Sequence, residues 1–506
     1  MSERMPATPI DTGKPSAWSG DCLVIGVCEG NKPQEALKLC GQGVEEIVHT
    51  ALAAKWLHGK AGESLLLPMP AGGASGARAL LLIGLGKRDE ITRERLRGIG
   101  GTIFAQARKS TLSTLLCLIP LDRQGLKRSV AAAALAEGVL LGSYRFDHYR
   151  QESPENERFQ PQSFTLAVRK EDAAAVDERL KRVRAVVDGV FLARDLGNHP
   201  ANVVNPDYLA NQARLLGERH DLRTTIFGID ELQAAGMNGI LAVGQGSRNH
   251  PRLITLEYRN GGDKSPLVVV GKAITFDAGG ISLKPAEKME NMKYDMSGGA
   301  AVFGFLQAVA TMRLPINVVG IVPAAENLPS GTAQRPGDII RTAKGVCVEV
   351  INTDAEGRLI LADALHHAER FQPRYLIDLA TLTGACVVAL GVECAGLLGN
   401  DKRLMRRLQR VGEESGERLW PLPMFPEYQE HIKSDFADIK NAGTRDAGTI
   451  MGGCFLSRFV EKGRPWAHLD IAGTAQEKTG RPHVPKGGSG FGVRLLCAFA
   501  RKHMMD

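Results

Sequence analysis

The chain has 506 residues, of which 43% are hydrophobic and 24% charged, and a formal net charge of +7. One hydrophobic core rarely organises a chain of this length, so we expect two domains. The small net charge excludes a strongly basic nucleic-acid binder as the leading class and predicts a mildly basic, solvated surface.

The nine cysteines are scattered along the chain, and none form a CxxC pair. Most lie in apolar strings, which favours buried reduced thiols over a zinc finger or a disulfide framework. The polar N-terminus lacks the apolar core of a signal peptide, and no run approaches the roughly 20 apolar residues that span a bilayer. We therefore expect a cytoplasmic protein that does not bind a membrane.

The first part of the chain alternates short apolar runs with helical patterns, which predicts a smaller N-terminal α/β domain over residues 1–170. The predicted elements are strands at Cys22–Val27, Ala79–Gly84, Leu115–Ile119 and Ser163–Val168, and helices at Pro33–Ala54 and Ser129–Leu141. Apolar side chains then recur at three- and four-residue steps, which predicts a connecting helix over residues 171–196. Glycine and proline in the sequence Gly197–Pro200 end it.

A second α/β pattern follows over residues 197–506. Its predicted strands are Leu253–Tyr258, Leu267–Gly271, Ile316–Val322, Val346–Ile351 and Tyr375–Leu379, with helices between them, including one at Gly357–Phe371. The pair His366–His367 lies on that helix without a ligand partner at a suitable spacing, so we interpret it as structural.

Three junctions of the second domain carry candidate chemistry. Lys272 closes an apolar strand and Asp277 precedes two glycines, Asp295 precedes a glycine-rich helix start, and Asp354 and Glu356 follow another strand. Strand ends of this kind are where α/β proteins present functional side chains.

Each junction also has a purely structural explanation. Thr353–Glu356 matches the [ST]xx[DE] capping box, which taken alone is the favoured interpretation of that segment. Asp277 stands at an ordinary turn position, Asp295 could cap its helix, and Lys272 could be a plain strand-end lysine.

Together the junctions are harder to explain as structure alone. Parallel strands would bring them to one sheet edge, where four carboxylates would repel one another unless cations neutralise them. Two divalent ions about 3.5–4 Å apart are the usual hydrolytic arrangement that does so. Oxygen ligands with few histidines suit Mn²⁺ or Mg²⁺, although catalytic Zn²⁺ also accepts carboxylates.

The octapeptide NTDAEGRL at 352–359 matches the signature of the leucyl aminopeptidases, or cytosol aminopeptidases, without a mismatch. VGKAITFDAGGISLKP (270–285), MKYDMSGGAA (292–301) and DLATLTGAC (378–386) resemble the same family in order and spacing. The resemblance covers essentially the whole second domain. It implies a two-domain α/β protein whose C-terminal catalytic domain, residues 197–506, has a central mixed β-sheet flanked by helices. It also implies a metal-dependent aminopeptidase that releases N-terminal, preferentially leucine-like residues from peptides.

The resemblance implies two overlapping sites for divalent Mn²⁺ or Zn²⁺ in each subunit. Lys272, Asp277, Asp295 and Glu356 would hold the tighter ion, and Asp277, Asp354 and Glu356 the more exchangeable one. A water bridging the ions would be the nucleophile. Lysine ligates only as the neutral amine, so the adjacent dication would have to lower the pKa of Lys272.

The remaining implied roles belong to residues around the metals. Lys284 would stabilise the developing oxyanion, and Arg358 would hold a bicarbonate ion that acts as general base. Residues expected to bind substrate are Met292, Thr381, Leu382 and Gly384. The family is usually homohexameric, so the resemblance also implies a homohexamer. Basic clusters at 93–97, 181–184 and 402–410 leave open a DNA-binding role of the kind some bacterial members have, but solvated helix faces are the favoured interpretation.

Overall fold

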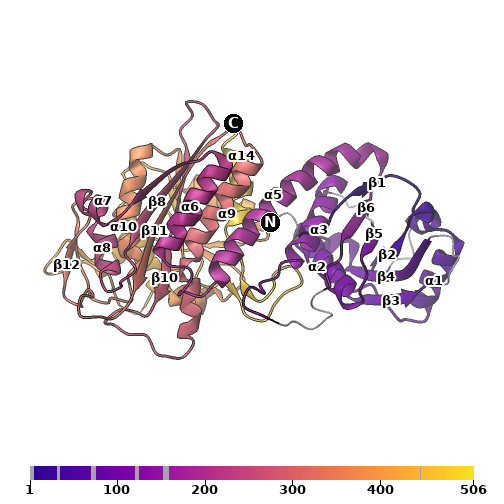
Figure 1. Cartoon of the computed structure of the whole chain (residues 1–506), viewed down its shortest axis with the longest axis horizontal. Coiled ribbons are helices and arrows are strands. Elements are labelled where there is room, and N and C mark those ends of the chain that lie inside the picture. The colour runs from indigo at the N-terminus through magenta and orange to yellow at the C-terminus, as the bar shows by residue number, and fades with distance from the viewer. Residues whose placement is uncertain are drawn as a thin grey trace. The chain divides into compact units, whose positions relative to one another are not determined.

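The computed structural model describes residues 5–30, 35–69, 76–119, 125–151, 159–444 and 446–505. The chain divides into two compact units, Met1–Val187 with Thr479–Lys486, and Asp188–Lys478 with Gly487–Asp506. Helix α5 (Ala173–Asn198) gives its first part to one unit and its last part to the other (Figure 1).

The N-terminal unit is a six-stranded sheet with helices on both faces (Figure 1). Its strand order is β1-β6-β5-β2-β4-β3, and all neighbours are parallel except β4 and β3. Its elements are β1 (Ile10–Asp11), β2 (Ser19–Cys28), α1 (Gln42–Ala53), β3 (Ser64–Pro68), β4 (Gly76–Gly86), α2 (Arg93–Lys109), β5 (Thr114–Leu118), α3 (Arg128–Gly142) and β6 (Ser163–Ala167).

Alternate residues of β2 face two different cores. Cys22 and Val24 pack with α2 and α3, while Leu23 and Ile25 pack with α1. A sheet covered on both faces needs continuous apolar strands, which is the pattern that made these strands recognisable in the sequence.

One predicted helix of this unit is wrong in extent. The pattern predicted a helix over Pro33–Ala54, but α1 begins at Gln42 and a separate 3₁₀ segment, Glu35–Cys40, precedes it. Gly41 between them has a φ of 93°, which no helical residue adopts and which interrupts the element. Residues 33 and 34 lie outside the described part of the chain.

The second unit contains a mixed nine-stranded sheet. The strand order is β16-β15-β18-β14-β9-β11-β8-β7, and β10 also pairs with β11. The central neighbours β18, β14, β9 and β11 run parallel, whereas β8, β7 and β15 join antiparallel. These strands are β7 (Arg223–Phe227), β8 (Arg252–Arg259), β9 (Leu267–Gly271), β10 (Ala273–Asp277), β11 (Asn317–Asn327), β14 (Tyr375–Ala380), β15 (Ala395–Gly399), β16 (Leu419–Pro421) and β18 (Trp466–Asp470).

Helices cover both faces of this sheet (Figure 1). Helices α8, α10 and α13 share one apolar core with β9 and β11, whereas α9 packs on β9, β11 and β14 and contacts α6 and α14. The helices of the unit are α6 (Pro206–His220), α7 (Ile229–Ala234), α8 (Asn238–Gly244), α9 (Ser297–Thr311), α10 (Gly357–Ala368), α11 (Gly384–Leu390), α12 (Lys402–Ser415), α13 (Gly448–Ser457) and α14 (Val493–His503). The expected α/β fold with a mixed sheet flanked by helices is confirmed.

Two small sheets complete the unit. One joins β12 (Ile339–Arg341), β13 (Cys347–Glu349) and β17 (Ile439–Lys440), and the other joins β19 (Gln476–Glu477) and β20 (Gly487–Gly488). The strand predicted at Val346–Ile351 is therefore β13 and lies outside the central sheet. The prediction that parallel strands of a single sheet deliver all three carboxylate junctions is wrong in this respect.

None of the nine cysteines, all within the described residues, forms a disulfide, and most are buried. Among the residues that the structure describes, no helix combines the length and apolarity that crossing a membrane requires.

Candidate active site

The chain turns inward at Lys272, between β9 and β10. The backbone N–H of Lys272 donates to the Leu379 carbonyl on β14 at 3.0 Å, which anchors the turn to the sheet. The residue is only 2% exposed. The ammonium Nζ lies 2.9 Å from Asp295 Oδ2 and 2.9 Å from Glu356 Oε1, and it donates to the Thr381 carbonyl at 2.9 Å. Lys272 therefore stands at the centre of the predicted site.

Asp277 ends β10 and is fixed from two sides. Its Oδ1 accepts from the Gly279 backbone N–H at 2.9 Å and from Asn327 Nδ2 at 2.9 Å. Its Oδ2 lies 2.9 Å from Lys284 Nζ, and the same ammonium pairs with Asp354. Asp277 is thus both the turn residue that the structural explanation required and part of the charged cluster.

Asn327 is a site residue that sequence reasoning missed. Its Nδ2 also donates to the Thr353 carbonyl at 3.0 Å, so one amide holds Asp277 and the signature loop together. Strand β11 reaches Asn327, five residues beyond the predicted end at Val322. The signal was the further apolar run Pro323–Ala325, which continues the strand up to this amide.

The capping-box explanation for the signature loop is wrong. The residue before α10 is Glu356, whose side chain caps no backbone N–H. Thr353 is buried, and its hydroxyl bonds to residues outside α10. It donates to the Gly279 carbonyl at 2.6 Å and accepts from the Ser282 N–H at 2.8 Å. Likewise Met296 precedes α9, so Asp295 is not its cap.

Helix α10 approaches Lys272 so closely that its first residue must be small. A Cβ on Gly357 would lie 2.5 Å from Lys272 Cε and 2.7 Å from its Nζ. The glycine that follows Glu356 therefore makes room for the lysine that Glu356 binds.

The four carboxylates reach this cluster from different elements. Asp277 comes from β10, Asp295 from the 3₁₀ segment Met289–Met296, and Asp354 and Glu356 from the loop after β13. A ligand oxygen of Asp277, Asp354 and Glu356 can be chosen so that all three lie within 4.8 Å of one another. The sequence-predicted carboxylates are therefore together, although no single sheet edge supplies them.

Burial makes these negative charges costly. It raises the pKa of Glu356 to about 8, with Asp277 adding to the rise, and raises the pKa of Asp295 to about 6. The pKa of Asp354 is also raised, first by burial and then by Asp277. A buried group of four carboxylates and two lysines has excess negative charge, so it favours further cations.

The pKa values of the two lysines are also raised, but for a lysine this favours the charged form. Burial opposes the ammonium of Lys272, but Asp295 and Glu356 outweigh it and raise its pKa. The pKa of Lys284 is raised likewise: burial opposes its charge, but Asp277 and other carboxylates outweigh that. A neutral Lys272 amine therefore requires additional positive charge beside it.

The chemistry of the cluster fits divalent cations. Oxygen donors of high charge density are the ligands that Mn²⁺, Mg²⁺ and catalytic Zn²⁺ accept. Asp295 Oδ2 and Asp354 Oδ1 are buried and, among the described residues, have lysine ammonium contacts but no aligned hydrogen-bond donor. Such oxygens have lone pairs to offer a metal ion.

Arg358 is buried in the first turn of α10. Its Nη1 donates to the Asn441 carbonyl at 2.7 Å, and the guanidinium carbon lies 5.9 Å from the centre of the Phe455 ring. Asn441, which sequence reasoning also missed, uses its side chain to hold the Ile351 N–H and the Asn352 carbonyl. Burial lowers the pKa of Arg358 to about 10, so it remains a cation at neutral pH.

The predicted substrate residues lie on two segments. Met292 is on the 3₁₀ segment that carries Asp295. Thr381 Oγ1 donates to Asp295 Oδ1 at 2.6 Å, Leu382 follows it, and Gly384 begins α11. Thr381 therefore contacts the charged cluster directly. Met292 is a near neighbour of Asp295 in sequence, and Leu382 and Gly384 are near neighbours of Thr381.

With this geometry in place, comparison with known proteins is decisive. The catalytic-domain model of the cytosol aminopeptidase family matches residues 191–497, and the family's N-terminal-domain model matches residues 24–153. The chain belongs to the cytosol aminopeptidase family. The resemblance carried by the NTDAEGRL signature is confirmed, and membership places the chain among the peptidase hydrolases.

Known relatives match this chain over nearly its full length. A probable cytosol aminopeptidase of a Geobacter species is 47% identical over 497 residues, covering 97% of this chain and 99% of the relative. One from Pseudomonas aeruginosa is 44% identical over 495 residues, covering 97% and 98%. A mutant of tomato leucine aminopeptidase superposes with a TM-score of 0.86 at 32% identity, covering 98% of this chain and 96% of the other. The bottromycin maturation enzyme BotP in complex with Mn gives 0.83 at 33% identity, covering 96% and 99%.

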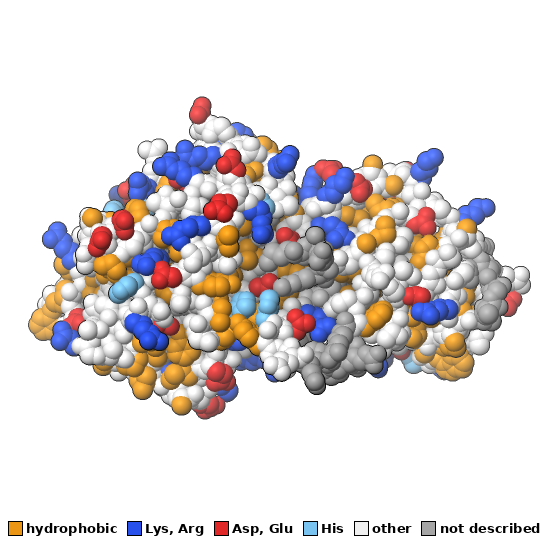
Figure 2. All heavy atoms as spheres, viewed as in Figure 1, with side chains coloured by type: hydrophobic (Ala, Val, Ile, Leu, Met, Phe, Trp, Pro, Cys, Tyr) orange, Lys and Arg blue, Asp and Glu red, His pale blue; other side chains and the backbone are white. Residues whose placement is uncertain are grey.

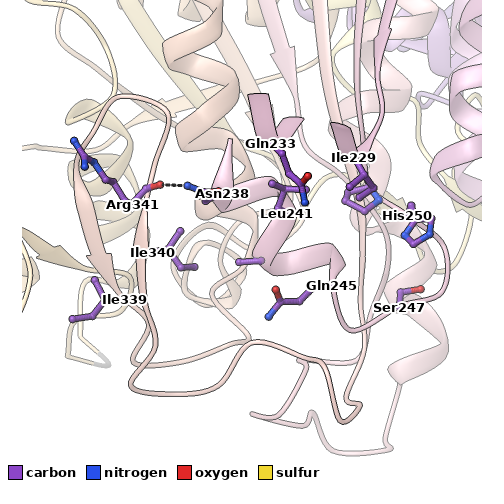
Figure 3. Close-up of a pocket in the computed structure, with 12 residues that line it drawn as sticks. Ile229, Gln233, Asn238, Leu241, Gln245, Ser247, His250, Ile339, Ile340 and Arg341 are labelled. Carbon is purple, nitrogen blue, oxygen red and sulfur yellow. Dashed lines mark hydrogen bonds between the residues drawn. The ribbon is translucent and has the colours of Figure 1, made fainter. Parts of the chain in front are cut away.

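The second unit also has a hollow of about 570 Å³ between α8 and β12 (Figure 3). Asn238 and Arg341 line it and are joined by a 2.7 Å hydrogen bond from Asn238 Nδ2 to the Arg341 carbonyl. None of the residues predicted for the site is in its lining.

Acidic neighbours pair with members of two of the basic clusters, 93–97 and 181–184. Arg97 pairs with Glu94 and Glu137, and Lys181 pairs with Asp177. On the visible face, basic and acidic side chains are interspersed (Figure 2). The exposed pair of Lys181 with Asp177 is what solvated helix faces typically show, whereas Arg97 and Glu137 are buried.

Proposed function

We propose that this chain is a metal-dependent leucyl aminopeptidase that uses two divalent ions, Mn²⁺ or Zn²⁺, to release leucine-like residues from the N-termini of peptides. The observation that carries the proposal is the convergence of four carboxylates on Lys272 and Lys284 in a buried cluster. The manganese complex of BotP and the tomato leucine aminopeptidase, both alike over nearly the whole chain, support the metal and the activity.

The cluster supplies two overlapping ligand sets. Lys272, Asp277, Asp295 and Glu356 would hold one ion, and Asp277, Asp354 and Glu356 the other. When bound, the ions would supply Lewis-acid activation of water and of the scissile carbonyl. Gly279 and Asn327 hold Asp277 at fixed orientation, which keeps its other oxygen, Oδ2, directed at Lys284 within the cluster.

Lys284 and Arg358 carry the catalytic charges. Lys284 is partly exposed and contacts Asp277 and Asp354, so a cation that neutralises those carboxylates would free its N–H groups to stabilise a developing oxyanion. Arg358 has a fixed guanidinium beside the cluster and would hold bicarbonate as general base. This assignment explains how the site works without a histidine within it.

Substrate would lie against the two segments that flank Asp295. Thr381 is tied to the Asp295 carboxylate, so a peptide bound along Thr381, Leu382 and Gly384 would be positioned relative to the ligands themselves. Met292 and Leu382 would offer apolar surface to a leucine-like side chain.

Hydrolysis of leucine p-nitroanilide tests the proposal. We expect chelation to abolish the activity and Mn²⁺ or Zn²⁺ to restore it. We expect Lys284→Ala and Asp354→Asn to lower kcat/KM by at least about 100-fold, the range for loss of an oxyanion donor. Lys433→Ala, which removes an exposed lysine paired with Glu430, is the matched control. Wild-type activity in the first two variants contradicts the assigned roles.

A homohexamer is the proposed assembly, and the cytoplasm the proposed compartment. Three apolar side chains of the catalytic unit are strongly exposed: Val388 at 90%, Phe425 at 59% and Phe436 at 78%. Such surface supports burial against further copies of the chain. Light scattering during size-exclusion chromatography measures the molar mass of the assembly. The mass of a single chain would contradict the homohexamer.

A further inference from the structure

The loop 381–384, which joins β14 to α11, is open on one side and buried on the other. Leu382 is half-buried and Gly384 is exposed, so both are accessible to a substrate. Thr383 between them is buried. The first residue of the loop is bonded to the charged cluster, since Thr381 Oγ1 donates to Asp295 Oδ1 at 2.6 Å. The position of the loop is therefore tied to a proposed metal ligand.

Asp470, the last residue of β18, holds the buried side of this loop. Its Oδ2 accepts from Thr383 Oγ1 at 2.6 Å, and the two residues are 87 positions apart in the chain. Its Oδ1 accepts from the Leu382 N–H at 3.2 Å and from the Thr383 N–H at 3.4 Å. A hydroxyl–carboxylate bond of about 2.5–2.7 Å is of the strong, charge-assisted kind. One fully buried carboxylate thus binds both the backbone and a side chain of the loop.

Helix α13 contacts the same loop. Thr449 Oγ1, in the first turn of the helix, lies 2.9 Å from Thr383 Oγ1. Gly452, one turn further along, leaves room for Leu382, because a Cβ on this glycine would lie 2.8 Å from Leu382 Cδ2. The loop is therefore held between the end of β18 and α13, and the hydroxyl of Thr383 bonds to both.

Local structure explains only part of these contacts. Thr383 is the N-cap of α11, where its Oγ1 accepts from the Cys386 N–H at 3.1 Å. Asp470 Oδ1 accepts from the Ala472 N–H at 3.2 Å, as aspartates commonly do in turns. A cap and a turn each need one acceptor oxygen, and neither needs a bond between Thr383 and Asp470. A buried carboxylate is costly, and a purely structural link between two elements is made at lower cost by apolar side chains.

We propose that Asp470 is a positioning residue for substrate, which acts through Thr383 and keeps the loop 381–384 in the arrangement that binds the peptide beside the metal ligands. The proposal rests on the proposed function, because it takes this loop as the surface along which the peptide lies. Without the bond to Thr383, the binding arrangement becomes one of several, and the apparent affinity for substrate falls in proportion to its population. Turnover at saturating substrate is retained, so KM should rise while kcat is kept.

The first test measures kcat and KM for leucine p-nitroanilide with metal-loaded protein. Thr383→Val keeps the shape of the side chain and removes the hydroxyl. We expect it to raise KM at least about tenfold, the effect of losing one hydrogen bond to a charged group, and to change kcat less than about threefold. Thr383→Ser keeps the hydroxyl and should hold KM within about threefold of wild type. Metal affinity by calorimetry should be unchanged in both variants, because neither removes a proposed ligand.

Thr342→Val is the matched control. Thr342 is also buried in the second unit, and its hydroxyl donates to the Val346 carbonyl at 2.9 Å. A purely structural role for the Thr383 hydroxyl would lower the melting temperature and leave KM of the folded enzyme unchanged. Wild-type KM in Thr383→Val overturns the proposal, and so does a KM in Thr383→Ser as high as in Thr383→Val.

A double variant tests whether Asp470 acts through Thr383. Asp470→Asn removes the charge that accepts from the hydroxyl and should itself raise KM. Because both changes act on one bond, Thr383→Val combined with Asp470→Asn should raise KM no further than the larger single change. Increases in KM that multiply in the double variant show that the two residues act independently and overturn the proposal.

The second test does not use activity. Hydrogen–deuterium exchange of metal-loaded protein follows the Leu382 and Thr383 amides, which both donate to Asp470. We expect faster exchange in Thr383→Val and Asp470→Asn, and wild-type rates in Thr383→Ser and Thr342→Val. If the wild type does not hydrolyse leucine p-nitroanilide, the proposed function fails, and exchange alone decides whether Asp470 holds the loop: wild-type rates in Thr383→Val overturn that role. Thermal unfolding identifies a variant that fails to fold, and Asp470→Asn then replaces Thr383→Val in both tests.

Discussion

The substitution Gly357→Ala tests whether activity and metal binding depend on the observed position of Lys272. The added Cβ would lie 2.5 Å from Lys272 Cε and 2.8 Å from its Cδ, whereas ordinary contacts begin near 3.4 Å. The lysine would have to move by roughly 1 Å, and it is only 2% exposed, so the ammonium would leave Asp295 or Glu356. A misplacement of this size costs about 100-fold in rate, or about 2.7 kcal/mol.

The measurements are kcat/KM for leucine p-nitroanilide and metal affinity by calorimetry. Alanine favours helix over glycine by up to about 1 kcal/mol, but overpacking at this buried contact costs roughly 1–3 kcal/mol, so thermal unfolding of the variant is measured as well. Gly98→Ala is the matched control: it is also in a helix, α2, and its Cβ would meet nothing within 4 Å. Metal affinity and kcat/KM within twofold of wild type in Gly357→Ala would refute the reasoning.

Three further predictions follow from the same contacts. The pKa of Glu356 is raised from 4.5 to about 8, so in metal-free protein its stabilising proton is fully present below about pH 4.5 and lost as pH rises through 8. Chemical unfolding of metal-free protein between pH 5 and 8 should therefore show a smaller loss of stability in Glu356→Gln than in wild type. Asp363 is fully buried and accepts from the Ile240 and Ala343 N–H groups, so Asp363→Ala should lower the free energy of unfolding by about 3 kcal/mol; a loss below about 1 kcal/mol would contradict this. Because Arg97 and Lys181 have acidic partners, gel shifts should detect only weak DNA binding that falls steeply with salt, and salt-resistant binding would contradict a phosphate-contact mechanism.

The fold was largely predictable where burial fixes the sequence pattern. Strands covered on both faces, such as β2 and β9, are continuous apolar runs, and the long helix α5 keeps its periodicity to Asn198. The same pattern does not reveal which sheet a strand joins. Val346–Ile351 reads as a core strand, yet β13 pairs with β12 and β17, because pairing depends on contacts distant in sequence.

The candidate site was also only partly predictable from the sequence. Each carboxylate was visible in the sequence, but Thr353–Glu356 satisfied a capping box equally well, since local spacing cannot tell a cap from a ligand loop. What separates them is long-range: Thr353 bonds to Gly279 and Glu356 reaches Lys272, across 74 and 84 residues of chain. Asn327 was missed for a related reason. Its neighbours in sequence mark it as a strand residue, and only the register of β10 with β11 gives it a carboxylate to hold. Residues proposed to bind substrate or metal are therefore accessible to motif recognition, whereas those that orient them are found only when the strands are paired.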